Sequence, residues 1–125
     1  MNLQLINKSI YDRLKSIKGI TVADSVTVNA KRPYIVLAET TVTPWNSKTT
    51  KGYEVTTGVL VYSDYKGDKE INEIVAKVHE VLVEKLTFQD GYKVITQSLE
   101  TVSVERMEEY REAQLDLNLK IFKGE

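Results

Sequence analysis

The only histidine of the chain, His79, is the first side chain that could take part in catalysis or metal binding. A general base needs a group that orients it, and a metal ion needs several ligands. Glu80 and Glu84 follow closely, but Glu80 projects from another side of the expected helix and no second histidine exists. We therefore interpret His79 as a residue at the boundary of an apolar helix stripe, without a chemical role.

Four carboxylates in "ERMEEYREA", residues 105–113, could in principle bind a metal ion or perform acid–base catalysis. Arg106 and Arg111 lie among them. Mixed charge between two expected strands is more typical of a solvated hairpin, and we predict no catalysis there. The carboxylates are those of Glu105, Glu108, Glu109 and Glu112.

Gly67 in "YKGDKE" precedes an expected helix, and a helix N-terminus can bind an anion. A phosphate loop needs more glycines and a positioned lysine, and Asp68 would repel an anion, so we predict that Asp68 caps the helix. Several lysines at expected turns are interpreted as solubilising charge, because no RNA-binding sheet pattern accompanies them. They are Lys31, Lys48, Lys51, Lys66 and Lys69. The sequence thus predicts no catalytic residue, no metal site and no cofactor.

The length and composition predict one soluble domain, residues 1–125, which is long enough to bury a hydrophobic core without stabilising cross-links. The net charge of −1 is unlike that of a dedicated nucleic-acid binder. The absence of cysteine excludes disulfides, thiolate zinc sites and cysteine nucleophiles. The N-terminus lacks the apolar run of a signal peptide, and no apolar stretch reaches the roughly 20 residues that span a bilayer. We expect an intracellular protein without a membrane segment.

The elements that must position these side chains follow from hydrophobic periodicity. Helical spacing predicts helices over residues 2–19, with Gly19 as the stop, and 68–86. Strands are expected over 33–42, 54–63, 93–107 and 114–122. The alternating pattern within 20–32 is too short to assign a strand there. Gly58 suggests a bulge or a close approach, and an irregularity is expected near Leu99 to Val102. We predict an α+β fold: an antiparallel sheet of four or five strands with both helices packed on one face.

A series of short motifs runs from residue 32 to residue 82. "PYIVL" is followed by an acidic residue, then by "PW", a polar residue and a lysine. A Gly-Tyr-Glu stretch, a strand ending in "VYS" and a glycine before a helix come next, and "IYDRL" at 10–14 fits the opening helix. In this order the motifs resemble the tail completion (tail-to-head joining) family of long-tailed bacteriophages and prophages. The residues that carry the match are Glu39, Lys48, Gly52, Glu54, Glu70, Ile74, Val78 and Leu82.

The resemblance implies structural work rather than catalysis. Such proteins are similar to tail terminators, small α+β subunits that form a hexameric ring on the last ring of tail tube protein. The ring stops tube polymerisation and meets the head connector, and DNA passes through its lumen without sequence-specific contact. The implied partners are thus copies of the chain itself, the tail tube protein and the head connector. The implied location is the virion, after assembly in the bacterial cytoplasm. A metabolic enzyme or ligand-binding α+β domain, and a regulatory interaction module of similar fold, remain the alternatives.

The loop in "TPWNSKTTKGYEV", residues 43–55, carries the only tryptophan beside Pro44. The indole could fold back over the sheet edge and anchor its own loop. Alternatively, because polar neighbours offer it little packing, the arm could order against another subunit or the tube, as tryptophans often dominate interfaces. We predict an assembly contact formed by Trp45, Asn46, Ser47, Lys48, Thr49, Thr50 and Lys51.

Overall fold

The computed structural model describes residues 3–23, 32–46, 51–64, 67–88 and 91–123. Within these residues it has two helices and one five-stranded sheet. In chain order the elements are α1 (Leu3–Lys15), β1 (Thr21–Ala23), β2 (Tyr34–Pro44), β3 (Gly52–Ser63), α2 (Lys69–Val81), β4 (Tyr92–Arg106) and β5 (Arg111–Lys123). No helix in this part of the chain is long and apolar enough to span a membrane.

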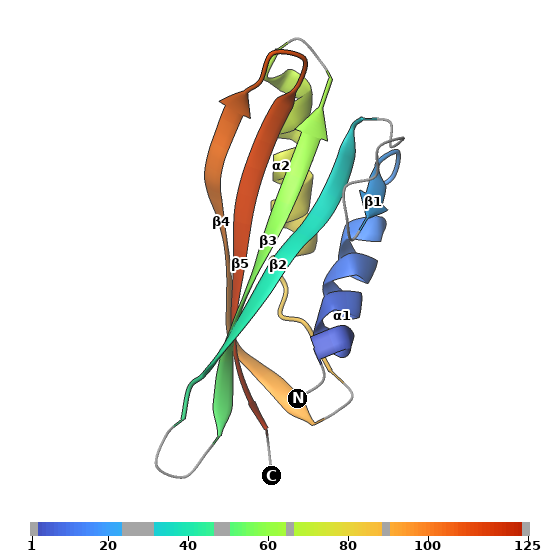
Figure 1. The fold of residues 1–125 in the computed structure, drawn as a ribbon. Helices are drawn as coiled ribbons and strands as arrows, with labels where there is room; N and C mark the ends of the chain where they lie inside the picture. The colour runs from blue at the N-terminus through green and yellow to red at the C-terminus, as the bar shows by residue number, and fades with distance from the viewer. Residues whose placement is uncertain (1–2, 24–31, 47–50, 65–66, 89–90, 124–125) are drawn as a thin grey trace.

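The strands lie in the order β1-β2-β3-β5-β4. All neighbouring strands are antiparallel except β1, which pairs in parallel with β2. The sheet is long and twisted, and α2 lies behind β3 and β5 while α1 lies beside β1 and β2 (Figure 1). The predicted α+β fold is therefore confirmed, and the parallel β1 is an addition that the periodicity did not predict.

One hydrophobic core joins both helices to the same face of the sheet. Alternate residues of β5 point into this core, as predicted. The residues Leu115, Leu117, Leu119 and Ile121 are fully buried. The apolar stripe of each helix faces these residues, because its members recur every three or four positions. The helix residues in the core are Ile6, Ile10, Leu14, Ile71, Ile74 and Val78.

Two predicted irregularities are confirmed. A Cβ added to Gly58 would lie 3.1 Å from the Ala38 Cβ, and the β2–β3 register shifts beside this contact, between Leu37 and Thr40. β4 shifts register between Thr101 and Ser103, and again between Val94 and Thr96. Extra residues of this kind bend a strand and increase its twist.

Both ends of α2 differ from the prediction. Asp68 occupies the N-cap position but makes no capping hydrogen bond with its side chain. Its carboxylate instead binds Arg106 at 3.3 Å and Arg111 at 3.4 Å, because the β4–β5 hairpin brings these cations to the helix start. At the other end α2 stops at Val81, although the buried stripe continues through Leu82 and Leu86.

Two long-range side chains explain why the helix stops there. The Gln97 amide donates to the carbonyls of Leu82 and Glu84, each at 2.7 Å, and accepts from the Leu86 N–H at 2.9 Å. The Arg13 guanidinium donates to the carbonyls of Val81, Glu84 and Lys85. Backbone groups that a longer helix would pair internally are thus satisfied from β4 and α1.

We predict that Gln97→Ala lowers the free energy of unfolding by about 2 kcal/mol, since it removes three hydrogen bonds worth roughly 0.5–1.5 kcal/mol each. Gln114→Ala, which truncates the same side chain at an exposed position of β5, is the matched control. Urea denaturation of both variants measures the difference. Equal stabilities would show that water replaces Gln97 at the helix end.

Candidate assembly interface

The described residues of the segment predicted to form an assembly contact are Trp45, Asn46 and Lys51, which lie where β2 ends and β3 begins. These ends of β2 and β3 extend beyond both helices (Figure 1). The Trp45 N–H donates to the Gly52 carbonyl at 2.8 Å, and the Gly52 N–H donates to Asn46 Oδ1 at 3.3 Å. These bonds close the described part of the hairpin. Ser47, Lys48, Thr49 and Thr50 lie outside the described residues.

Trp45 has an internal partner and an exposed surface. Its ring stacks on Phe122 of β5, with centroids 5.0 Å apart and an interplanar angle of 14°. The Lys120 Nζ lies 5.2 Å from the indole centroid and 3.9 Å from a Glu54 carboxylate oxygen. Yet 37% of Trp45 remains accessible. The indole therefore anchors its own hairpin and still offers an apolar surface at the tip.

Gly52 makes this packing possible. A Cβ at this position would lie 2.7 Å from the Trp45 carbonyl oxygen, the Ile121 carbonyl oxygen and the Phe122 Cδ1. Sequence reasoning did not identify Phe122 as the partner of Trp45. The available signal was an aromatic residue on the outward side of the alternating strand 114–122.

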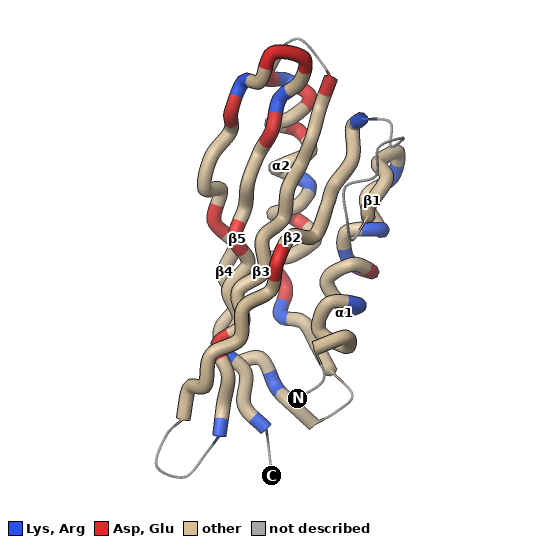
Figure 2. The backbone as a smooth tube through the Cα atoms, viewed as in Figure 1, with Lys and Arg blue, Asp and Glu red and all other residues tan. Residues whose placement is uncertain are grey.

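Four lysines among the described residues lie near this tip, and we name them the lysine end: Lys51, Lys93, Lys120 and Lys123. The pairings Gly52↔Phe122 and Tyr92↔Lys123 bring their strands together at one level. Figure 2 shows basic residues at these ends of β3, β4 and β5. The Glu54 carboxylate lies beside them and pairs with Lys120.

The opposite end of the sheet is acidic. There the β4–β5 turn closes through a 2.8 Å bond from the Met107 N–H to the Tyr110 carbonyl, and we name residues 105–112 the acidic hairpin. Glu105 and Glu112 are direct cross-strand partners, an arrangement of like charges that costs stability. Red segments mark this hairpin and the end of β3 in Figure 2.

Aromatic contacts fasten the acidic hairpin to the sheet. Tyr62 lies 4.9 Å from Tyr34 and 5.7 Å from Tyr110 between ring centroids. Burial raises the pKa of Tyr62 to about 12, and the nearby Glu112 carboxylate adds to the shift. Arg32 lies over the Tyr110 ring and forms an ion pair with Asp64. The predicted solvated hairpin is thus exposed at its tip and anchored at its base.

The other chemistry candidates are not brought together. His79 is half-buried on α2, and its Nε2 lies 3.0 Å from the Thr101 Oγ1. No group of three metal-binding side chains occurs among the residues that the structure describes. Of the turn lysines, Lys51 and Lys69 are exposed, whereas Lys31, Lys48 and Lys66 lie outside the described residues.

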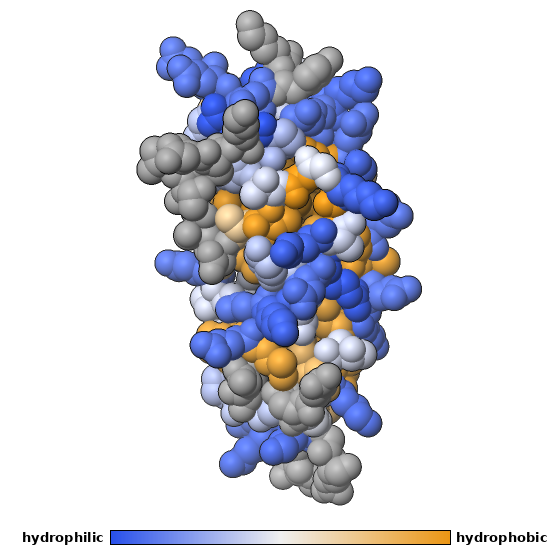
Figure 3. All heavy atoms as spheres, turned by 90° about the vertical axis from the view of Figure 1, so that its right-hand side faces the viewer, coloured by the Kyte–Doolittle hydropathy of each residue, from blue (hydrophilic) through white to orange (hydrophobic). Residues whose placement is uncertain are grey.

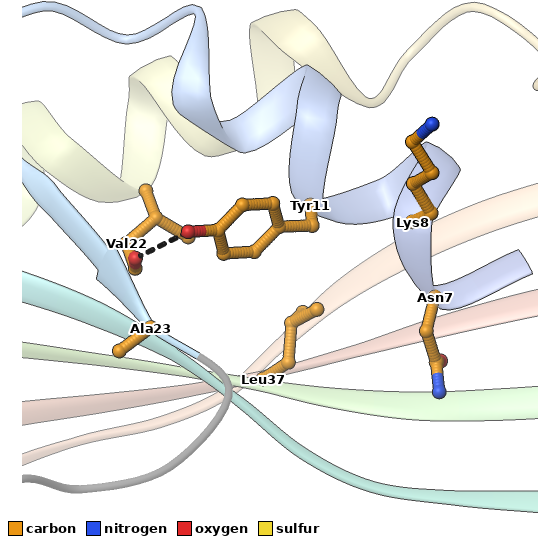
Figure 4. A pocket seen from close by; sticks show the side chains of 6 residues that line it. All are labelled: Asn7, Lys8, Tyr11, Val22, Ala23 and Leu37. Carbon is orange, nitrogen blue, oxygen red and sulfur yellow. Dashed lines mark hydrogen bonds between the residues drawn. The ribbon is translucent and has the colours of Figure 1, made fainter. Parts of the chain in front are cut away.

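A cavity of about 430 Å³ lies between α1 and the strands β1 and β2. Tyr11 closes it by donating to the Val22 carbonyl at 3.1 Å, and Leu37 forms part of the lining. Lys8 and Asn7 extend in opposite directions and do not converge with the Tyr11 hydroxyl (Figure 4). From the side of α1 and β1, Figure 3 shows apolar areas interrupted by hydrophilic residues. The cavity lacks the convergent polar groups typical of a ligand site.

Residues 8–122 match the family model described as Tail completion protein gp17. Among solved structures, the chain is similar to a chain from the virion of a native gene transfer agent (GTA) particle. The two share 18% identity and a TM-score of 0.80 over 97% of this chain and 99% of that chain. At this identity the likeness shows a common fold. No curated protein matches the chain.

We predict that Gly52→Ala costs about 1–3 kcal/mol of stability, the usual range for overpacking, because two of the atoms that the new Cβ meets are backbone oxygens. Gly58→Ala is the matched control, since its Cβ would meet one methyl group at 3.1 Å. Urea unfolding gives the stabilities, and the emission of the single tryptophan reports on the stack. Equal losses in both variants would contradict the packing role assigned to Gly52.

Proposed function

We propose a specific virion role for this chain from one premise: it belongs to the tail completion protein gp17 family, whose model matches residues 8–122. Membership supports a structural role in a phage-type tail. We propose that copies of the chain form a hexameric ring on the end of the tail tube. The ring stops tube polymerisation and joins the tube to the head connector. The role requires no catalysis, and DNA passes through the lumen without sequence-specific contact.

The shape and charge of the subunit support this role. A ring between two structures needs two different surfaces along its axis. The lysine end and the acidic hairpin lie at opposite ends of one long sheet (Figure 2). Opposite charge favours a different partner at each end and disfavours the reversed orientation, because like charges repel. We therefore assign the tube and the connector to these two ends, without assigning which partner meets which end.

Electron microscopy of particles that carry the chain tests the role. We expect a ring of six copies between tube and connector, with a stoichiometry measurable by quantitative mass spectrometry. Particles with five or fewer copies, or without a ring at that junction, would contradict the proposal. A monomer in dilute solution would not, because assembly depends on subunit concentration.

We predict that Trp45→Ala yields a folded subunit that fails to join heads to tails. Truncation of an interface anchor typically costs upward of about 2 kcal/mol per copy, and a ring repeats the loss at each contact. Complementation of a deletion strain should therefore accumulate unjoined heads and tails, or overlong tails. Leu3→Ala is the control, because Leu3 is similarly exposed at 39% but lies on α1. Unfolding of the isolated Trp45→Ala subunit would assign the indole an internal role only. Normal joining by a folded variant would exclude this contact.

A further inference from the structure

The described part of the sheet has two open edges. The outer edge of β4 pairs with Thr87 at Lys93 and with no described strand beyond that point. β1 covers the outer edge of β2 only from Tyr34 to Val36. The rest of β2, through Pro44, has no described strand on that side. Unpaired edges of this kind are templates for pairing with another chain.

The β4 edge is also the most apolar exposed part of the described surface. Six large hydrophobic side chains are exposed among the described residues, and four of them lie on β4 or just after α2. Their exposed fractions reach 73% for Val83 and 52% for Val102. A shallow hollow lined by Val83, Leu99 and His79 adjoins them. The four side chains are Val83, Ile95, Val102 and Val104.

The two open edges are complementary. They lie at the same height along the sheet, and their strands run in opposite directions. Residue partners across the sheet place Thr40 of β2 level with Leu99 of β4, and Pro44 level with Val94. The open part of β2, from Leu37 to Pro44, therefore lies at the level of β4 residues 94–101. β2 and β4 also run in opposite directions, because three antiparallel pairings separate them. A rotation about an axis along the strands would bring β4 of one copy beside β2 of the next as antiparallel neighbours.

We propose that the β4 edge of one copy binds the open β2 edge of the next copy, with Val102 and Val104 packing at the level of β1. The occupant is a second copy because this same chain carries the complementary edge at matching height. The contact joins two different surfaces, and it closes into a ring when the rotation per copy allows. This inference rests on the proposed function, in which copies of the chain form such a ring.

A cysteine pair tests the contact directly, since the chain contains no cysteine. Thr41 and Ser98 are exposed and level with each other across the sheet. Cross-strand neighbours lie within disulfide reach. Oxidation of particles carrying Thr41→Cys/Ser98→Cys should give a ladder of covalent oligomers that ends at the closed ring. The control pair, Thr41→Cys/Lys77→Cys, replaces the β4 position with an exposed one on α2 and should give no ladder.

A second experiment tests the apolar part of the contact. Val102→Lys and Val104→Lys should abolish ring formation and joined particles while leaving the unfolding midpoint of the subunit unchanged. Leu3→Lys introduces the same charge at an exposed leucine away from the edge and should assemble normally.

The outcomes separate the two proposals. If wild-type particles contain the ring but the Thr41/Ser98 pair gives no ladder, the edge contact is overturned and the proposed function stands. The edge contact is likewise overturned if Val102→Lys prevents joining while the cysteine pair gives no ladder, because β4 then binds another protein. If wild-type particles contain no ring, the proposed function fails and the edge contact fails with it.

Discussion

The pairing of β3 with β5 is the constraint on which the rest of the structure depends. It runs from Gly52↔Phe122 to Ser63↔Arg111 without a register shift, whereas the outer pairs β2–β3 and β4–β5 both contain shifts. A slip by one residue would turn the leucines of β5 from the core to the opposite face. Burial of these leucines and of Val55, Val59 and Val61 therefore fixes the register along the whole length of the sheet.

This fixed register also determines what lies at the two ends. At one end it brings Phe122 level with Gly52, so that Trp45 can stack on it. At the other end it places Glu112 opposite Tyr62, beside the turn that carries further carboxylates. Between the ends, the face away from the helices is held by polar contacts, such as the 3.0 Å bond from Asn118 to Thr56. Among the described residues, most of the exposed large apolar side chains lie on β4 or just after α2.

The sequence predicted the elements whose pattern is local and long. The strict alternation of residues 114–122 and the helical spacing after Asp68 each reflect one-sided burial, which the structure confirms. The resemblance to tail completion proteins, carried by residues 32–82, is confirmed by the family match over 8–122. The features that were missed depend on partners far along the chain. Gln97 and Arg13 bind the backbone where α2 ends. Arg106 and Arg111 form ion pairs with the Asp68 carboxylate, which therefore does not cap the helix. No window of sequence around Val81 or Asp68 contains these groups.

In the proposed assembly, the edges and the ends have separate tasks. Contacts between copies use the edges, which face sideways, whereas tube and connector meet the ends, so the two kinds of contact do not compete for surface. The edge supplies apolar burial and backbone pairing, while charge at the ends selects partner and orientation. The two bulges of β4 make its edge irregular, and irregular edges resist indiscriminate pairing. On this proposal, we expect free subunits to stay apart at low concentration and the end of the tube to gather them at a local concentration that makes the edge contact favourable. The proposal thus implies that a terminating ring forms only where a finished tube presents its last layer.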